Sequence, residues 1–270
     1  MRPLLILAFA AALQLPAESL QFNPVTREVL EKSITLAVRD NAQRGAQLRH
    51  LFDQNGCSGE FLTEQVVSKK RPPNIICRLP GETPSTIIVG AHFDAFGSDG
   101  YADNWSGSAL LPALYTALKG VPRKHTYLFV GFTDEESGLK GSRHFVKKMS
   151  KEDIADAHAM VNLDTLGMSP LNVWASRADP DLLKHLRMVA AALRMPLNGV
   201  NVEQVGTTDS ESFAPVRVRR ISVSSITQEN WRILHSPMDR LERINADEYY
   251  NSYRLLAAFL AHLDAKLTTR

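Results

Sequence analysis

The sequence predicts an α/β protein with a mixed, largely parallel central sheet that is flanked by helices on both faces. Three observations lead to this class. Strand-like and helix-like segments alternate from residue 86 onward. The strand-like segments are almost continuously apolar, which is typical of strands covered on both faces. The 270 residues, of which 44% are hydrophobic and 22% charged, suffice for one sizeable globular domain.

The elements follow from the spacing of apolar residues. Before residue 86, helical spacing runs from Asn23 to Gln54 and ends at Asn55-Gly56, and short strands are expected at 61–67 and 75–79. Further strands are expected at 86–89, 126–130, 159–163, 171–175 and 220–226. Helices are expected at 104–119, 138–148, 179–194 and 247–267. No repeat or linker interrupts this order, so residues 18–270 are expected to form a single catalytic domain.

Residues 1–17 have the pattern of a secretory signal peptide. Arg2 precedes an apolar run of about ten residues, and a cleavage site follows near Ala17. The run is too short to span a bilayer comfortably, and no Cys follows it to carry a lipid, so no membrane anchor is expected. We therefore expect a secreted or periplasmic protein; a buried first helix is the alternative.

Composition and cysteine count narrow the function classes. Thirty-one Lys and Arg against 29 Asp and Glu give a net charge of +2 without a long basic block, so nucleic-acid binding is not expected. In an oxidising compartment Cys57 and Cys77 are expected to form a disulfide, which would stabilise the fold by about 3 kcal/mol. Two buried free thiols are the alternative.

Ionisable side chains stand directly after three of the expected strands. In chain order they are His92 and Asp94, then Glu135 and Glu136, then Asp164. Ligands bind beyond the carboxyl ends of strands in an open α/β sheet, so we expect these side chains to gather there.

Two further candidates lie elsewhere in the chain. Asp103 precedes the helix expected at 104–119, and His235 lies in a late loop. Taken singly, each candidate has a plain structural interpretation, such as Asp103 acting as a helix cap. Taken together, they predict a metal site, because imidazoles and carboxylates without cysteine suit Zn²⁺, and less well Mn²⁺ or Co²⁺.

The number of candidates indicates two metal ions. One zinc needs only three protein ligands, whereas two ions about 3.5–4 Å apart need a bridging carboxylate and two further ligands each. Five residues meet that count: His92, Asp103, Glu136, Asp164 and His235. Glu135 is left beside a ligand, where a general base is wanted.

Five ordered motifs extend this pattern over about residues 60–267. They are Gly90-Ala91-His92-Phe93-Asp94, Asp103-Asn104-Trp105-Ser106-Gly107, Asp134-Glu135-Glu136-Ser137-Gly138-Leu139-Lys140-Gly141-Ser142, Asn162-Leu163-Asp164 and His235-Ser236-Pro237-Met238-Asp239. Together they resemble the co-catalytic zinc exopeptidases of metallopeptidase family twenty-eight. That family includes secreted bacterial aminopeptidases, the plasma glutamate carboxypeptidase type and the glutaminyl cyclases.

The resemblance implies a zinc-exopeptidase, phosphorylase/hydrolase-like fold and two Zn²⁺ ions. One ion would take His92 and Asp164 and the other Glu136 and His235, with Asp103 bridging them.

It also implies catalytic roles. Glu135 would activate a metal-bound water, and Asp94 would accept the ring N–H of His92 and so fix its tautomer. Asp239 would do the same for His235, or else cap a helix. Asp209 lies where the family has a Ser-Asp-His segment, but Ser210 replaces the His, so no role is carried over. The short loop between His92 and Asp103 indicates an open rim.

The leading interpretation is a secreted exopeptidase, and more specifically an aminopeptidase, that acts on a peptide substrate. A glutaminyl cyclase, a carboxypeptidase of the same fold and a non-catalytic binding domain are the alternatives. Two features favour the hydrolases over the cyclases. One is the stretch Gly138 to Ser142, and the other is Leu234 before His235, where the cyclases usually have Trp. The sequon Asn104-Trp105-Ser106 lies inside a motif and is expected to remain unglycosylated. The sequence leaves the oligomeric state open.

Overall fold

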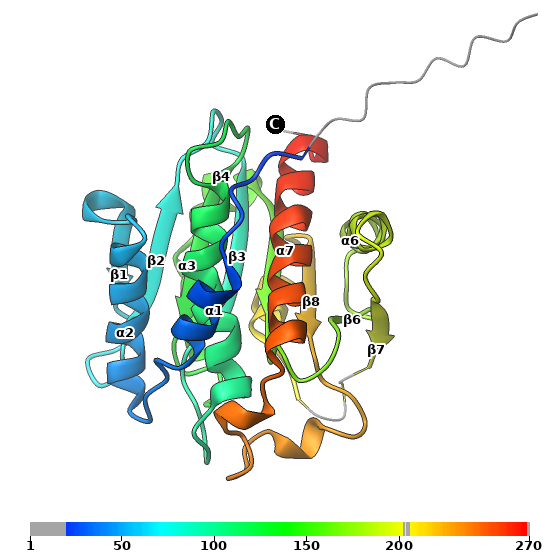
Figure 1. Cartoon of the computed structure of the whole chain (residues 1–270). Helices are drawn as coiled ribbons and strands as arrows, with labels where there is room; N and C mark the ends of the chain where they lie inside the picture. The colour runs from blue at the N-terminus through cyan, green and yellow to red at the C-terminus, as the bar shows by residue number, and fades with distance from the viewer. Residues whose placement is uncertain (1–19, 202, 204–205, 269–270) are drawn as a thin grey trace, which may run out of the picture.

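Eight strands form one mixed sheet in the computed structural model of the chain, which describes residues 20–268 except 202, 204 and 205 (Figure 1). Their order across the sheet is β1-β2-β4-β3-β5-β8-β6-β7. The strands are β1 (Leu62–Gln65), β2 (Asn74–Leu79), β3 (Thr86–His92), β4 (Thr126–Phe132), β5 (Ala157–Leu163), β6 (Asn172–Trp174), β7 (Asn198–Val200) and β8 (Arg220–Ser224). The signal peptide predicted at 1–17 lies outside the described residues.

The centre of the sheet is parallel. Strands β4, β3, β5 and β8 pair in parallel, so their carboxyl ends lie at one edge. Antiparallel pairs occur between β1 and β2, β2 and β4, and β6 and β8. Every residue from Ile87 to His92 is buried, which explains the continuous apolar run of β3. The predicted fold class is confirmed.

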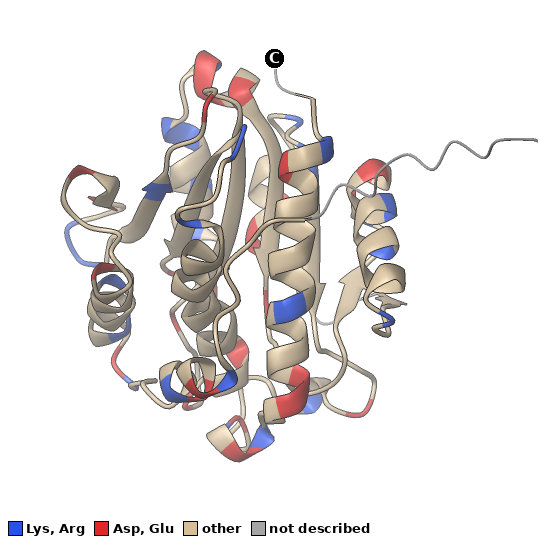
Figure 2. Cartoon of the chain, turned by 45° about the horizontal axis from the view of Figure 1, so that its top comes forward, with Lys and Arg blue, Asp and Glu red and all other residues tan. Residues whose placement is uncertain are grey.

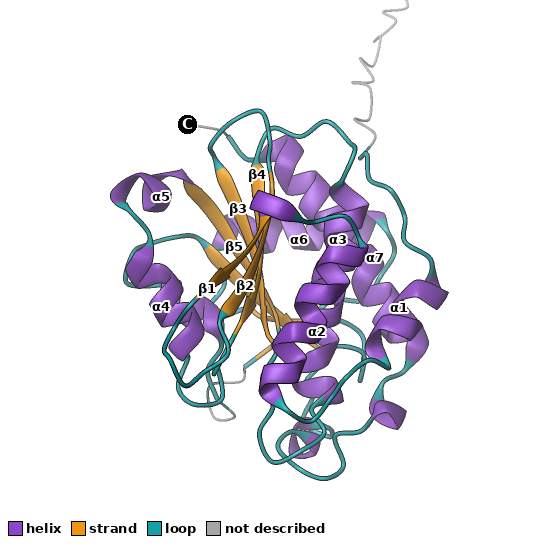
Figure 3. Ribbon diagram, turned by 90° about the vertical axis from the view of Figure 1, so that its left-hand side faces the viewer, coloured by secondary structure: helices purple, strands orange, loops and turns teal. Residues whose placement is uncertain are grey.

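Helices cover both faces of the sheet (Figure 3). One face carries α1 (Arg27–Ile34), α2 (Asn41–Gln54), α3 (Ser106–Leu118), α6 (Pro180–Ala192) and α7 (Ala246–Lys266). The other carries α4 (Lys140–Lys148) and α5 (Lys151–Asp156). Basic and acidic residues are interspersed over the ribbon in Figure 2, in line with the small net charge. No helix in the described part of the chain is long and apolar enough to cross a membrane.

Some element boundaries differ from the sequence prediction. The helical stretch expected over 23–54 is two helices, because Asp40 caps a new start by accepting a hydrogen bond from the Gln43 N–H at 2.8 Å. The helix expected from 138 begins at Lys140, since Gly138 and Leu139 have left-handed backbone with φ of 98° and 58°. The short elements α5 and β7 were not predicted from the apolar spacing.

The helix expected from residue 104 also starts later. Helix α3 begins at Ser106, and Tyr101–Trp105 form a wider turn in which Asp103 and Asn104 leave helical geometry. Asp103 therefore does not act as a simple helix cap.

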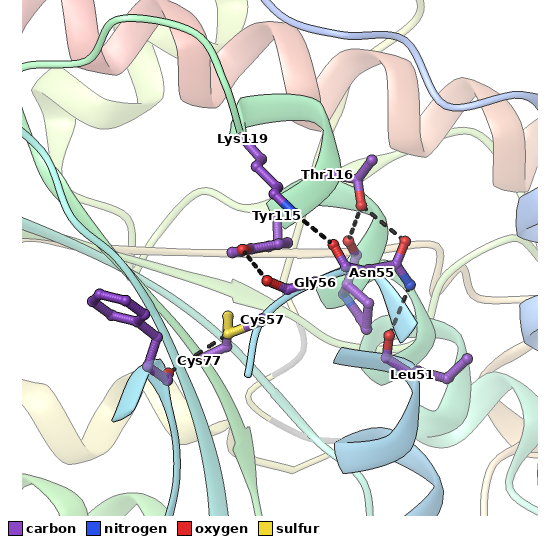
Figure 4. Close-up of a disulfide and its surroundings, with 10 residues drawn as sticks. Leu51, Asn55, Gly56, Cys57, Cys77, Tyr115, Thr116 and Lys119 are labelled. Carbon is purple, nitrogen blue, oxygen red and sulfur yellow. Dashed lines mark hydrogen bonds between the residues drawn. A yellow bond between two sulfur atoms is a disulfide. The ribbon is translucent and has the colours of Figure 1, made fainter. Parts of the chain in front are cut away.

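Cys57 and Cys77 form the predicted disulfide, with 6.2 Å between their Cα atoms (Figure 4). The bridge joins the turn after α2 to strand β2. Figure 4 shows the same turn held from α3: the hydroxyl of Tyr115 donates to the carbonyl of Gly56 at 3.0 Å, and that of Thr116 donates to Asn55 Oδ1 at 2.9 Å. The alternative of two free thiols is excluded.

A pair of histidines between α6 and α7 predicts a pH dependence of stability. His185 Nδ1 lies 2.9 Å from His262 Nε2, and one imidazole must donate while the other accepts. Burial lowers the pKa of both rings, and their mutual repulsion lowers that of His262 further. The unfolded chain therefore binds more protons, so the pair's stabilisation is present above the ordinary His pKa of about 6.5 and is lost as the pH falls below it.

We expect the free energy of unfolding to fall less between about pH 7.5 and pH 5.5 in the double variant His185→Gln/His262→Gln than in the parent chain. Urea unfolding at both pH values measures this, and the other titrating groups cancel in the comparison. Equal losses in the two proteins would contradict the prediction.

Candidate metal centre

The carboxyl ends of three parallel strands bring the predicted residues together. His92 is the last residue of β3 and Asp94 follows it, while Asp164 follows directly after β5. Glu135 and Glu136 lie on the turn after β4, and this turn places them against the end of β3 through hydrogen bonds to Asp94.

Asp103 lies between two groups of side chains. Its Oδ1 is 3.2 Å from His92 Nε2, which is also 3.6 Å from Asp164 Oδ1. Its Oδ2 is 3.2 Å from His235 Nε2, which is also 2.9 Å from Glu136 Oε2. In each group of three, one atom per residue lies within 4.8 Å of the others. The two groups share Asp103.

The residues present fit two zinc ions. Donors about 2.0–2.2 Å from a tetrahedral zinc lie roughly 3.3–3.6 Å apart, close to the 2.9–3.6 Å observed between the paired atoms. Glu136 Oε1 is buried without a hydrogen-bond partner among the described residues, as expected of an oxygen that needs a cation. The donor set contains no sulfur and suits zinc.

Glu135 belongs to neither group but lines the same cavity as His92, Asp103, Asp164 and His235. The cavity holds about 570 Å³ of empty space, part of it open to solvent. Its apolar walls come from Trp174, Val223, Ile226 and Leu234. An acid that contacts the cavity without joining a ligand group is free to exchange protons with a bound molecule.

Asp94 connects the turn after β4 to the His92 ring. His92 Nδ1 lies 3.2 Å from the backbone carbonyl of Asp94 and 3.5 Å from its Oδ1. The same carboxylate accepts hydrogen bonds from the backbone N–H groups of Glu135 at 3.0 Å and Glu136 at 3.2 Å. Asp94 thus contacts His92 mainly through its backbone carbonyl and both glutamates through its carboxylate, and so fixes them relative to one another.

The charges at the site favour an added cation. Burial opposes protonation of His92, but hydrogen bonds to Asp103 and Asp164 outweigh it and raise its pKa well above the ordinary value. Hydrogen bonds to Asp103 and Glu136 raise the pKa of His235 to about 10. Burial, only partly offset by His92, raises the pKa of Glu135 to about 10. Acids crowded in this way are relieved by protons or by a divalent cation.

The sequence suggested that Asp239 holds the His235 ring or caps a helix, but in the structure it does neither. Its two oxygens accept hydrogen bonds from the backbone N–H groups of Ala102 at 2.7 Å and Asp103 at 3.0 Å. The loop that carries His235 is therefore tied to the segment that carries Asp103. The side chain is fully buried, and burial raises its pKa to about 6.

Asp239→Asn is expected to weaken zinc binding, because an amide NH₂ would face one of the two backbone N–H donors that fix Asp103. Outer groups that orient a metal ligand typically change metal affinity by 10–100-fold. Zinc affinity measured by competition with a fluorescent chelator checks this. The exposed Asp247→Asn is a matched control, and equal affinities in both variants would contradict the role of Asp239.

Two buried polar residues near the site have structural roles that the sequence did not indicate. Arg44 lies on the buried face of α2, four residues before Leu48. This spacing was the one sequence signal that Arg44 is buried. Asn104 donates to the Leu163 carbonyl at 2.9 Å and accepts from the N–H groups of Gly107 and Thr165, both at 3.0 Å. Its complete burial leaves no room for a glycan on the sequon.

Asp209 is also brought close to the site. It is completely buried, and burial raises its pKa to about 7, with repulsion from Asp94 and Asp164 adding to the effect. The Ser210 hydroxyl, where the family has a His, is paired instead with the hydroxyls of Thr208 at 3.0 Å and Ser222 at 2.8 Å.

Known proteins resemble the chain in sequence and fold. Aminopeptidase YwaD of Bacillus subtilis (strain 168) is 25% identical over 205 residues, which cover 73% of this chain but 44% of that protein. The solved structure of BSAP, a zinc aminopeptidase from Bacillus subtilis, matches with a TM-score of 0.66 at 24% identity, over 73% of this chain and 52% of that one. An Acidobacteriales bacterium glutaminyl cyclase matches with a TM-score of 0.73 at 18% identity, over 95% and 100% of the two chains.

A family model covers most of the region that carries the five motifs. The model described as peptidase family M28 matches residues 74–260, which include every predicted ligand from His92 to His235. This match agrees with the strand order and with the edge of the sheet where the acidic and imidazole groups lie. The chain therefore belongs to peptidase family M28.

Proposed function

We propose that the protein is a zinc-dependent exopeptidase that removes the N-terminal residue of peptides. The observation that carries the proposal is the position of Asp103 between two groups of imidazole and carboxylate ligands, with Glu135 in the same cavity. The aminopeptidase names of the relatives support the amino-terminal direction. Since the chain spans 44% of the length of YwaD, the metal-dependent hydrolysis is inferred from this chain's own residues, and only the amino-terminal direction is inferred from the relatives' names.

Five residues hold the metals in this proposal. His92 and Asp164 would hold one zinc, Glu136 and His235 would hold the other, and Asp103 would contribute to both. Zinc bound there would lower the pKa of water and polarise the scissile carbonyl.

The chain's own groups carry the proton and position the substrate. Glu135 takes a proton from the attacking water and delivers it to the leaving amine nitrogen. Asp94 keeps the Glu135 backbone and the His92 ring in register through the hydrogen bonds described above. Trp174, Ile226 and Leu234 contact the side chain of the terminal residue and exclude water from it.

The same proposal includes export. The pattern of residues 1–17 and the Cys57–Cys77 disulfide both favour an oxidising compartment outside the cytoplasm. Residues 18–270 then form the single catalytic domain of the mature protein.

Substrates that differ only at one terminus test the proposal. Leucine 7-amido-4-methylcoumarin, its N-acetylated form and an N-acetylated peptide with a free carboxyl terminus are compared with and without a zinc chelator. We expect only the free amino terminus to be cleaved, with activity lost in chelator and restored by zinc. Cleavage of the acetylated substrate would contradict the direction, and turnover in excess chelator would contradict the metal site.

Cyclisation of N-terminal glutamine is the second candidate. The nearly complete coverage of solved glutaminyl cyclases favours it, whereas Leu234 before His235 is unlike the Trp usual in that group. Ammonia release from a glutaminyl peptide distinguishes cyclisation from hydrolysis.

A further inference from the structure

The two proposed histidine ligands have different surroundings. The His92 side chain is 2% exposed, and its Nδ1 faces Asp94. The His235 side chain is 49% exposed, and its Nδ1 has no hydrogen-bond partner in the described part of the chain. His235 also has a left-handed backbone with φ of 54°. An imidazole that projects into solvent from such a loop needs another contact to keep Nε2 directed at Asp103 and Glu136.

Phe96 supplies a contact of this kind. Its ring lies perpendicular to the His235 imidazole, at an interplanar angle of 89° and a centroid distance of 6.1 Å. This is the edge-to-face arrangement that aromatic rings prefer. The backbone approaches as well, because a Cβ added to Gly97 would lie 3.3 Å from the His235 carbonyl oxygen. Phe96 itself is 65% exposed, so core packing does not account for its position.

The loop that carries Phe96 is fixed on both sides. Before it, Asn41 Oδ1 accepts from the Ala95 N–H at 3.0 Å, and Asn41 Nδ2 donates to the Ala95 carbonyl at 3.3 Å. After it, Arg44 donates to the carbonyls of Asp99 at 3.0 Å and Gly100 at 2.7 Å. Helix α2 thereby holds the ring against His235.

We propose that Phe96 is a positioning residue that holds the His235 imidazole toward Asp103 and Glu136 and so raises the affinity of that half of the site for zinc. This inference rests on the proposed function, since it takes His235 as a zinc ligand. It assigns the exposed ring to the metal site rather than to the core or to the substrate.

The test is zinc affinity, measured by chelator competition on the metal-free protein reloaded with zinc. Phe96→Ala is expected to weaken binding of one of the two zinc ions by about tenfold, the lower end of the usual effect of an orienting partner. Phe96→Tyr keeps the ring and should bind as the parent does. Met238→Ala removes another exposed apolar side chain, three residues after His235, and should leave both affinities unchanged.

A double-mutant comparison shows whether the ring acts through His235. If it does, adding Phe96→Ala to a His235→Ala chain changes zinc affinity no further. The melting temperature of metal-free Phe96→Ala should stay close to that of the parent, because the side chain is mostly exposed.

Parental zinc affinity in Phe96→Ala would overturn the inference. So would a loss of zinc affinity on adding Phe96→Ala to the His235→Ala chain that equals the loss in the parent chain. Altered selectivity among dipeptides with unaltered zinc binding would also overturn it and would make Phe96 a substrate contact. Failure of the proposed function is seen separately. It appears as a parent chain that binds fewer than two zinc ions, or as a His235→Ala chain that binds them as tightly as the parent.

Discussion

Glu135→Gln is expected to lower kcat by about 10²–10⁴, the usual contribution of a positioned general base, while zinc content and KM change little. Glu135 lies in neither ligand group, and the amide keeps the shape of the side chain but cannot take a proton from water. Steady-state kinetics and metal analysis of the purified variant measure both effects. Wild-type kcat in this variant would exclude Glu135 as the base.

Glu136→Gln is the matched control, because it makes the same chemical change one residue away. Glu136 Oε2 lies 2.9 Å from His235 Nε2 and belongs to a ligand group, so zinc affinity should fall first and activity should follow. Excess zinc should restore part of the activity of Glu136→Gln and none of that of Glu135→Gln. Loss of zinc from Glu135→Gln alone would reverse the two roles.

Arg44→Met is expected to reduce the free energy of unfolding by about 3–5 kcal/mol, because several carbonyls lose their donor and each buried polar group left unsatisfied costs about 1–3 kcal/mol. Arg44 is completely buried and donates to the carbonyls of Phe93, Val38, Asp99 and Gly100. Burial lowers its pKa to about 10, so the guanidinium stays charged at neutral pH. Met would remove the donor from the carbonyls of Phe93, Val38 and Asp99, whereas the Gly100 carbonyl would still accept from the Trp105 N–H at 3.0 Å.

Chemical denaturation of the metal-free protein measures this effect. Arg44→Lys keeps the charge with fewer donors and should lose less stability. Arg49→Met lies on the same helix, but its partner Glu64 is a surface contact, with the two side chains 46% and 48% exposed. That variant should change stability by less than about 1 kcal/mol. A loss of stability in Arg44→Met no larger than that in Arg49→Met would contradict a stabilising role of the buried Arg44 contacts. If Arg44→Met does not fold, Arg44→Lys is compared with Arg49→Met instead.

The strands and their ends could be predicted because both are local properties of the sequence. Strand β3 is continuously apolar up to His92, and the rule that ligands gather at the carboxyl ends of parallel strands then places Glu135 and Asp164 at the same edge. The fold class and the family follow from such features, and the structure and the comparisons confirm both.

The contacts that hold the site could not be predicted in this way. Asp239 binds backbone 136 and 137 positions away, and Arg44 binds the carbonyl of Gly100 at a separation of 56 positions. Periodicity describes which face of an element is buried and carries no information on such distant partners. The same limit explains why apolar spacing predicts a helix from residue 104, where the structure has the turn Tyr101–Trp105 and a helix that begins at Ser106.

The tie between Asp239 and Asp103 has a consequence for the order of events during synthesis. The proposed ligands lie between His92 and His235, and the carboxylate that fixes Asp103 comes four residues later still. A nascent chain that ends before residue 235 therefore contains β3, β4 and β5, but it lacks the contacts of His235 with Asp103 and Glu136 and the Asp239 carboxylate that anchors Asp103. The proposed ligands and the anchor of Asp103 are therefore present together only after residue 239 has been synthesised.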